Sequence, residues 1–348
     1  MTSLKRLGWL LPLAALFLTG CHMVVLDPSG DIAAQQAHLV VQSTLLMLLI
    51  IVPVIVLTLV FAWRYRQSNR DAVYTPEWDH STQLELVIWG APLLIIIALG
   101  LITWISTHTL DPFRQLRRID EQRPLALDVK PLEVDVVALD WKWLFIYPEQ
   151  GIATVNELAA PVDRPIEFKI TASTVMNSFY IPALAGQIYA MPGMQTQLHA
   201  VINQAGDYAG FSANYSGAGF SGMHFRFHGM SEADFEAWVK TNQASNEHLD
   251  RAGYLKLEQP SINAPVQRFA QVDPVLFNAV LNRCVEEGKM CASDMMALDA
   301  SGGGVGTNNF TVASRNPVVS PRRTDRFVRA ELCVPTTKTL LPSVAARL

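Results

Sequence analysis

The chain has 348 residues, of which 50% are hydrophobic, with a mean hydropathy of +0.21 and a formal net charge of −4. The slightly acidic balance leaves no basic stripe for phosphates, and no Gly-rich phosphate loop opens a helix, which argues against nucleic acid and nucleotides as partners. The apolar residues are concentrated in the first third, which indicates a membrane protein with a soluble part. The four cysteines are too scattered for a disulfide framework or a paired Cys-x-x-Cys zinc site: Cys21, Cys284, Cys291 and Cys333.

Residues 1–20 predict a lipoprotein signal peptide. Lys5 and Arg6 precede an apolar run, residues 7–18, that is too short to span a bilayer. The run ends in Leu-Thr-Gly before Cys21, which resembles the bacterial lipobox. We therefore expect Cys21 to carry a lipid and to become the mature N-terminus. The alternative is an ordinary signal peptide followed by a chance cysteine.

Two apolar stretches, residues 39–63 and 84–106, are each long enough to cross the ~30 Å hydrocarbon layer as a helix. The loop between them, residues 64–83, carries Arg64, Arg66 and Arg70, whereas residues 21–38 carry no Lys or Arg. The bias of Lys and Arg toward the cytoplasm therefore places the loop inside and residues 21–38 in the periplasm. Three arginines after the second span run against this bias: Arg114, Arg117 and Arg118.

Residues 125–260 change to a period of two, which is typical of β-strands. Leu132, Val134 and Val136 alternate with Glu133 and Asp135, as in a strand buried on one face. Further short strands follow at a spacing that favours a Greek-key sandwich or barrel. A capping box that begins at Ser231 predicts a short helix near the end of this domain.

Four motifs in the exported domain carry a family resemblance. They are WKWLFIYPEQG at 141–151, VMNSFYIP at 175–182, QIYAMPGMQT at 187–196 and YSGAGFSGM at 215–223. In this order, and after two spans, they resemble subunit II of the haem–copper respiratory oxidases, in the bo-type ubiquinol oxidase branch. The resemblance extends from Cys21 to about Leu298. It implies a two-helix transmembrane hairpin followed by a cupredoxin-like Greek-key β-sandwich.

The resemblance also implies a function and partners. The chain would be a non-catalytic subunit of a proton-pumping ubiquinol oxidase of the bacterial inner membrane, which oxidises ubiquinol and reduces oxygen to water. The haems and one copper would lie in the large subunit I, so this chain would hold no cofactor. Its other partners would be smaller membrane subunits and membrane lipid.

The cytochrome c oxidase branch of the same superfamily binds two coppers in this domain. Its ligand pattern places a histidine, two bridging thiolates, a second histidine and a methionine at Asn177, Ser216, Phe220, His224 and Phe227 of this sequence. Only His224 retains the ligand type, and residues 125–260 contain no cysteine. Because soft thiolates are what that copper centre requires, we expect a metal-free domain with a structural and assembly role.

Two other groups of side chains in this domain have alternative interpretations. His224 and His228 have Met223 and Met230 beside them. The two histidines are either surface or core side chains without a metal, or ligands of a weak metal site. Their four-residue spacing on a strand favours side chains without a metal. Trp141 and Trp143 correspond to the aromatic segment that receives electrons in the copper branch. The alternative is an aromatic cluster packed under the loops.

Glu85 lies at the cytoplasmic end of the second span, where an ionisable group is costly unless it meets water or a partner. By resemblance it matches the subunit II glutamate at the mouth of a proton channel of the large subunit. We therefore expect Glu85 to serve proton uptake. The alternative is an interfacial glutamate in contact with headgroups.

The C-terminal part divides into a helical extension, residues 261–300, and a flexible or disordered tail, residues 301–348. A helix is predicted over residues 274–287, and Cys284 and Cys291 either pair or stay free. Two rival functions remain for the whole chain. One is a copper-bearing cytochrome c oxidase subunit II, and the other is a membrane-tethered periplasmic scaffold module.

Overall fold

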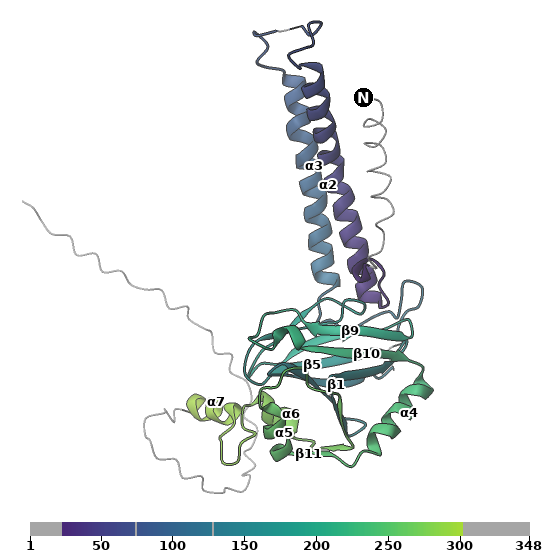
Figure 1. Ribbon diagram of the computed structural model, residues 1–348, viewed down its shortest axis with the longest axis vertical. Coiled ribbons are helices and arrows are strands. Elements are labelled where there is room, and N and C mark those ends of the chain that lie inside the picture. Colours follow the sequence, from purple (N-terminus) through teal and green to yellow (C-terminus); the bar gives the residue numbers. More distant parts are fainter. Residues whose placement is uncertain (1–22, 74, 127–128, 302–348) are drawn as a thin grey trace, which may run out of the picture. The chain divides into compact units, whose positions relative to one another are not determined.

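The computed structural model describes residues 23–301, apart from residue 74 and residues 127–128 (Figure 1). Two long helices, α2 (Asp31–Arg64) and α3 (Thr82–Thr109), follow a short 3-10 turn, η1 (Val24–Leu26). Both helices are long and apolar enough to cross a membrane, and they lie side by side. Each contains one proline, which a membrane helix tolerates. Cys21 and the signal segment lie outside the described residues.

The first turn of α2 is attached to the β domain. The backbone N–H groups of Ser29 and Gly30 both donate to the carbonyl of Ala183, at 3.0 and 2.9 Å. A Cβ on Gly30 would lie 2.6 Å from the carbonyl oxygen of Val201 and 2.7 Å from that of Leu184, so no other residue fits this position without a shift. Helix α2 therefore begins before the apolar stretch at 39–63 because its first turns belong to the outer domain.

The outer domain is a sandwich of two sheets, with strand orders β12-β3-β2-β1-β5-β8 and β4-β10-β9-β6-β7. Strands β1 and β5 pair in parallel, as do β4 and β10, so the two sheets are connected by crossovers. Helix α4 (Glu232–Gln243) follows β10, and the Ser231 side chain caps it by accepting a hydrogen bond from the Asp234 N–H at 3.2 Å. The strands are β1 (Leu132–Leu139), β2 (Lys142–Tyr147), β3 (Ile152–Val155), β4 (Glu157–Pro161), β5 (Ile166–Ala172), β6 (Asn177–Tyr180), β7 (Ile188–Ala190), β8 (Thr196–Ala200), β9 (Gly206–Ser212) and β10 (His224–Met230).

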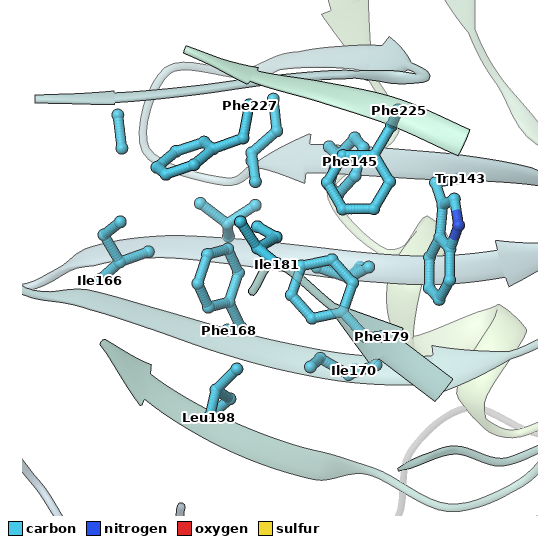
Figure 2. Packing of buried hydrophobic residues seen from close by; sticks show 14 of the residues in the cluster. Trp143, Phe145, Ile166, Phe168, Ile170, Phe179, Ile181, Leu198, Phe225 and Phe227 are labelled. Carbon is cyan, nitrogen blue, oxygen red and sulfur yellow. The ribbon is translucent and has the colours of Figure 1, made fainter. Parts of the chain in front are cut away.

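Aromatic side chains fill the centre of the sandwich, as Figure 2 shows. The rings of Phe179 and Phe225 stack with centroids 5.4 Å apart, and Phe145 lies 5.0 Å from Phe225. Trp143 meets Phe179 edge-on at 5.4 Å. These rings come from both sheets, so they hold the two layers together.

A second core covers the outer face of the first sheet. It joins Val137, Leu144 and Val155 to residues of the C-terminal segment, among them Tyr254 and Phe277. The segment contains β11 (His248–Leu249), α5 (Arg251–Glu258), β12 (Gln267–Phe269), β13 (Gln271–Val272), α6 (Leu276–Leu281) and α7 (Ala292–Ala300). Strand β1 is consequently buried on both faces from Val134 onward, and not on one face as its alternation predicted.

The C-terminal segment departs from the sequence prediction in one place. The helix predicted over 274–287 is shorter, because α6 ends at Leu281 and Arg283 has a left-handed φ of 56°. Cys284 and Cys291 are joined by a disulfide whose Cα atoms lie 4.8 Å apart. Residues 302–348, including Cys333, lie outside the described residues.

Candidate functional site

Asn177, the first of the five ligand positions of the copper branch, begins β6 and is buried. Its Oδ1 accepts a hydrogen bond from the Ser212 hydroxyl at 3.1 Å, and its Nδ2 donates to the carbonyl of Val175 at 3.1 Å. The amide therefore holds β9 against the loop that precedes β6. It offers no imidazole nitrogen to a metal.

Ser216 and Phe220, at the two thiolate positions, lie in the connection between β9 and β10. The Ser216 hydroxyl is buried and has no hydrogen-bond partner within the described part of the chain. Phe220 begins the turn η2 (Phe220–Gly222) and packs its ring 5.6 Å from that of Tyr215. A hydroxyl and a phenyl ring replace the two sulfur atoms that would bridge a copper pair.

His224 and Phe227 point to opposite faces of β10. His224 is exposed and its Nε2 lies 2.7 Å from the carbonyl oxygen of Ser221, whereas Phe227 is fully buried in the core. Side chains three positions apart on a strand face opposite sides. The structure therefore does not bring these two positions to one point.

The second histidine of β10 has separate partners. The Nδ1 of His228 is paired with the Asp207 carboxylate, and its Nε2 lies 3.6 Å from Oε1 of Glu157. Four residues along a strand span ~13 Å. His224 and His228 are thus independent side chains and not a joint metal site.

Trp141 lies in the turn before β2 with a left-handed φ of 68°, and not on the strand face that Trp143 occupies. Its Nε1 donates to the carbonyl of Ser216 at 3.1 Å. The loop covers the indole so closely that a Cβ on Gly219 would lie 2.3 Å from Cδ2 of Trp141. Trp141 therefore packs under the loop that holds Ser216 and Phe220, while Trp143 belongs to the core.

The residues present do not fit a copper pair. No thiolate is present in the domain, the amide of Asn177 is held by two hydrogen bonds, and Phe227 has no donor atom. Within residues 23–301, leaving aside those not described, no group of three or more His, Cys, Asp or Glu side chains could hold a metal ion. The donor set thus lacks the soft ligands that such a centre requires.

Comparisons with known proteins show the family of the chain. The family model described as "Cytochrome C oxidase subunit II, periplasmic domain" matches residues 128–228. The chain is 51% identical over 279 residues to cytochrome bo(3) ubiquinol oxidase subunit 2 of Pseudomonas putida, covering 80% of this chain and 86% of that protein. It is 51% identical over 281 residues to ubiquinol oxidase subunit 2 of Acetobacter aceti, covering 81% and 88%. The chain belongs to the subunit 2 family of ubiquinol oxidases. This confirms the resemblance and the fold class predicted from the sequence.

The C-terminal segment is a second family feature of this ubiquinol oxidase subunit. A model described as "COX Aromatic Rich Motif" matches residues 243–288, which build the second core. Lys142 fastens this segment to the sandwich: its buried Nζ donates to the carbonyl of Gln259 at 2.8 Å and to the Ser261 hydroxyl at 2.6 Å. Burial lowers the pKa of Lys142 below its ordinary value.

At the other end of the subunit, Glu85 lies in the first turn of α3 and is exposed. Its Oε1 lies 2.7 Å from Nδ1 of His80, and Nε2 of His80 lies 3.2 Å from the Thr82 hydroxyl. Glu85 shares a shallow groove on α3 with Trp89 and Gly90. His80 lies five residues before Glu85 and directly before the helix cap at Ser81, but nothing in its sequence context distinguishes it from a solvent-exposed loop histidine.

Proposed function

We propose that this subunit is a metal-free outer brace of a proton-pumping ubiquinol oxidase. Its sandwich covers the periplasmic face of a large haem–copper subunit I, and its helices pack against the flank of that subunit. The haems and the single copper of subunit I supply the redox chemistry, in which ubiquinol is oxidised and oxygen is reduced to water. Smaller membrane subunits complete the complex in the bacterial inner membrane.

The observation that carries this proposal is the replacement of both thiolate positions, by Ser216 and Phe220. An oxygen ligand does not stabilise the mixed copper valence, so electrons have no acceptor in this domain. The loop is instead closed over Trp141 by a hydrogen bond and by glycine contacts. Such packing stabilises a rigid cap and requires no metal.

The test is isolation of the intact complex from membranes. We expect oxygen uptake with ubiquinol but not with reduced cytochrome c, and a copper content that subunit I alone accounts for. Oxygen uptake with reduced cytochrome c, together with two further coppers per complex, would contradict the proposal.

Glu85 is proposed to admit protons to the complex from the cytoplasm. The neighbouring His80 supports this, because an imidazole 2.7 Å from the carboxylate can pass a proton to it from water. Glu85→Ala should slow turnover and proton pumping in an assembled complex, and Glu85→Asp should restore part of the rate. Glu77→Gln, an exposed change in the same loop, serves as the control. Unchanged pumping in Glu85→Ala would remove this role.

Cys21 is proposed to carry a lipid anchor that supplements the two spans. The support is the lipobox-like sequence before it. Metabolic labelling with a fatty acid should mark the wild-type chain and not Cys21→Ser. Labelling that persists in Cys21→Ser would place the lipid elsewhere.

A further inference from the structure

The three arginines after the second span have no place in the function described so far. Arg114, Arg117 and Arg118 lie on the outer side of the membrane, where Lys and Arg are usually sparse. Two of them already have contacts within the chain: an Nη of Arg114 donates to the carbonyl of His108 at 3.2 Å, and Arg118 is paired with Asp31. Their position at the end of α3 points to a ligand at the membrane surface.

Arg118 is held by a buried carboxylate in a way that leaves its terminal nitrogens free. Its Nε lies 2.9 Å from Oδ2 of Asp31, whose side chain is only 4% exposed. The same Oδ2 accepts a hydrogen bond from Nε2 of Gln35 at 2.8 Å. The two Nη atoms of Arg118 have no hydrogen-bond partner among the residues that the structure describes. A guanidinium fixed in this manner presents parallel N–H groups that match a phosphate oxygen pair.

A cleft of about 620 Å³ lies in front of Arg118, between α2, α3 and the segment that follows α3. Its lining combines polar side chains, among them Gln35, His38, Gln42 and Asn203, with the apolar side chains of Leu39, Ile102 and Ile105. The volume is within the range of small-molecule sites. The cleft therefore suits a molecule with a polar head and hydrocarbon chains.

The apolar residues of the cleft belong to the two stretches predicted to cross the membrane. Leu39 begins the first apolar stretch, and Ile105 lies next to the end of the second. Phospholipid headgroups occupy the next several ångströms outward, at roughly the level of Arg118. Glu121 provides an acidic group in the lining of the cleft. It is exposed and has no partner within the described part of the chain. Asp120 beside it is paired with Arg123.

From this geometry we propose that the cleft binds one zwitterionic aminophospholipid of the outer leaflet. The phosphate is bound by the Nη groups of Arg118, and the ammonium lies toward Glu121. The acyl chains run along Leu39, Ile102 and Ile105. A purely anionic lipid would be repelled by Glu121, and a quinol has no phosphate for Arg118.

The experiment uses the intact oxidase complex, purified in detergent and examined by native mass spectrometry for retained lipid. Arg118→Lys keeps a positive charge for Asp31 but removes the pair of Nη groups. Ile105→Trp fills the cleft without altering its charges. Arg226→Gln, an exposed change on β10, is the matched control. Haem content and assembly are measured for every variant, so that a misfolded complex is recognised.

We expect the wild type and Arg226→Gln to retain one phosphatidylethanolamine more than either cleft variant. In titrations of the delipidated complex, Arg118→Lys should weaken phosphatidylethanolamine binding by about tenfold or more. Glu121→Gln should remove the preference for phosphatidylethanolamine over phosphatidylglycerol. Equal retention in all assembled variants, competition by millimolar inorganic phosphate, or retention of ubiquinol in place of phospholipid would each overturn the proposal.

Discussion

Burial of the Asp135 carboxyl lowers the free energy of unfolding by an amount that depends on pH. It is 6% exposed, on the outer face of β1, and its Oδ1 has no hydrogen-bond partner among the described residues. Burial, reinforced by the charge of Glu133 and opposed by that of Lys169, raises the pKa of Asp135 from 3.8 to about 7. The carboxyl is therefore protonated in the folded chain over a range in which the unfolded chain has lost the proton.

The difference in the pKa of Asp135 between the folded and the unfolded chain sets the direction in which stability changes with pH. Between about pH 4 and pH 7 the folded state binds more protons than the unfolded state, so the free energy of unfolding falls as the pH rises. At 1.36 kcal/mol per pH unit the loss from this group is at most about 4 kcal/mol, and above pH 7 it stays constant. Asp135→Asn removes the titration and should be more stable than the wild type at pH 8.

The assay is guanidinium unfolding of the full chain in detergent at several pH values, followed by tryptophan fluorescence. The difference in the free energy of unfolding between Asp135→Asn and the wild type should grow from pH 4 to pH 7. Glu236→Gln, an exposed change on α4, should show no such trend. A difference that is independent of pH would refute the reasoning, because it would mean that the pKa of Asp135 is the same in the folded and the unfolded chain.

Three further predictions concern the outer domain. Gly219→Ala should lower the free energy of unfolding by ~1–3 kcal/mol, because its Cβ would enter the ring of Trp141; an unchanged melting temperature would show that the loop can move aside. Cys284→Ser with Cys291→Ser should cost ~2–3 kcal/mol, and reductant should destabilise the wild type but not the double variant. Lys142→Met should leave the carbonyl of Gln259 unpaired and cost ~1–3 kcal/mol, with faster proteolysis after residue 258 than in the wild type; equal cleavage rates would count against the fastening role.

Local chemistry was sufficient for several conclusions about this chain. The two candidate spans follow from long, predominantly apolar stretches, because a helix of that length and composition is stable in lipid. The alternation in β1 predicted a strand, and the motifs around Ser216 and Phe220 predicted the family and the loss of the thiolate ligands. The absence of cysteine sulfur can be recognised from the sequence alone, because it does not depend on distances.

Other features depend on which segments meet. Asp135 has the polar position of an alternating strand, which predicts exposure, but the neighbouring elements of the folded domain bury it. Trp141 and Trp143 share the period of a strand face, yet a left-handed turn separates them. Helix α6 ends at Leu281, and Cys284, which lies beyond that end, is joined to Cys291 by a disulfide.

The sequence by itself thus determined the two candidate membrane spans, the strand-rich outer domain and the family, since these depend on the period and chemistry of neighbouring residues. Only the tertiary structure decided that His80 meets Glu85, that Arg118 is held by Asp31, and that a second core covers the first sheet. The reason is physical. Burial and pairing depend on distances between segments. A long-range contact such as that between Asp31 and Arg118 produces no periodic pattern in the sequence around either residue, so it cannot be predicted from that sequence.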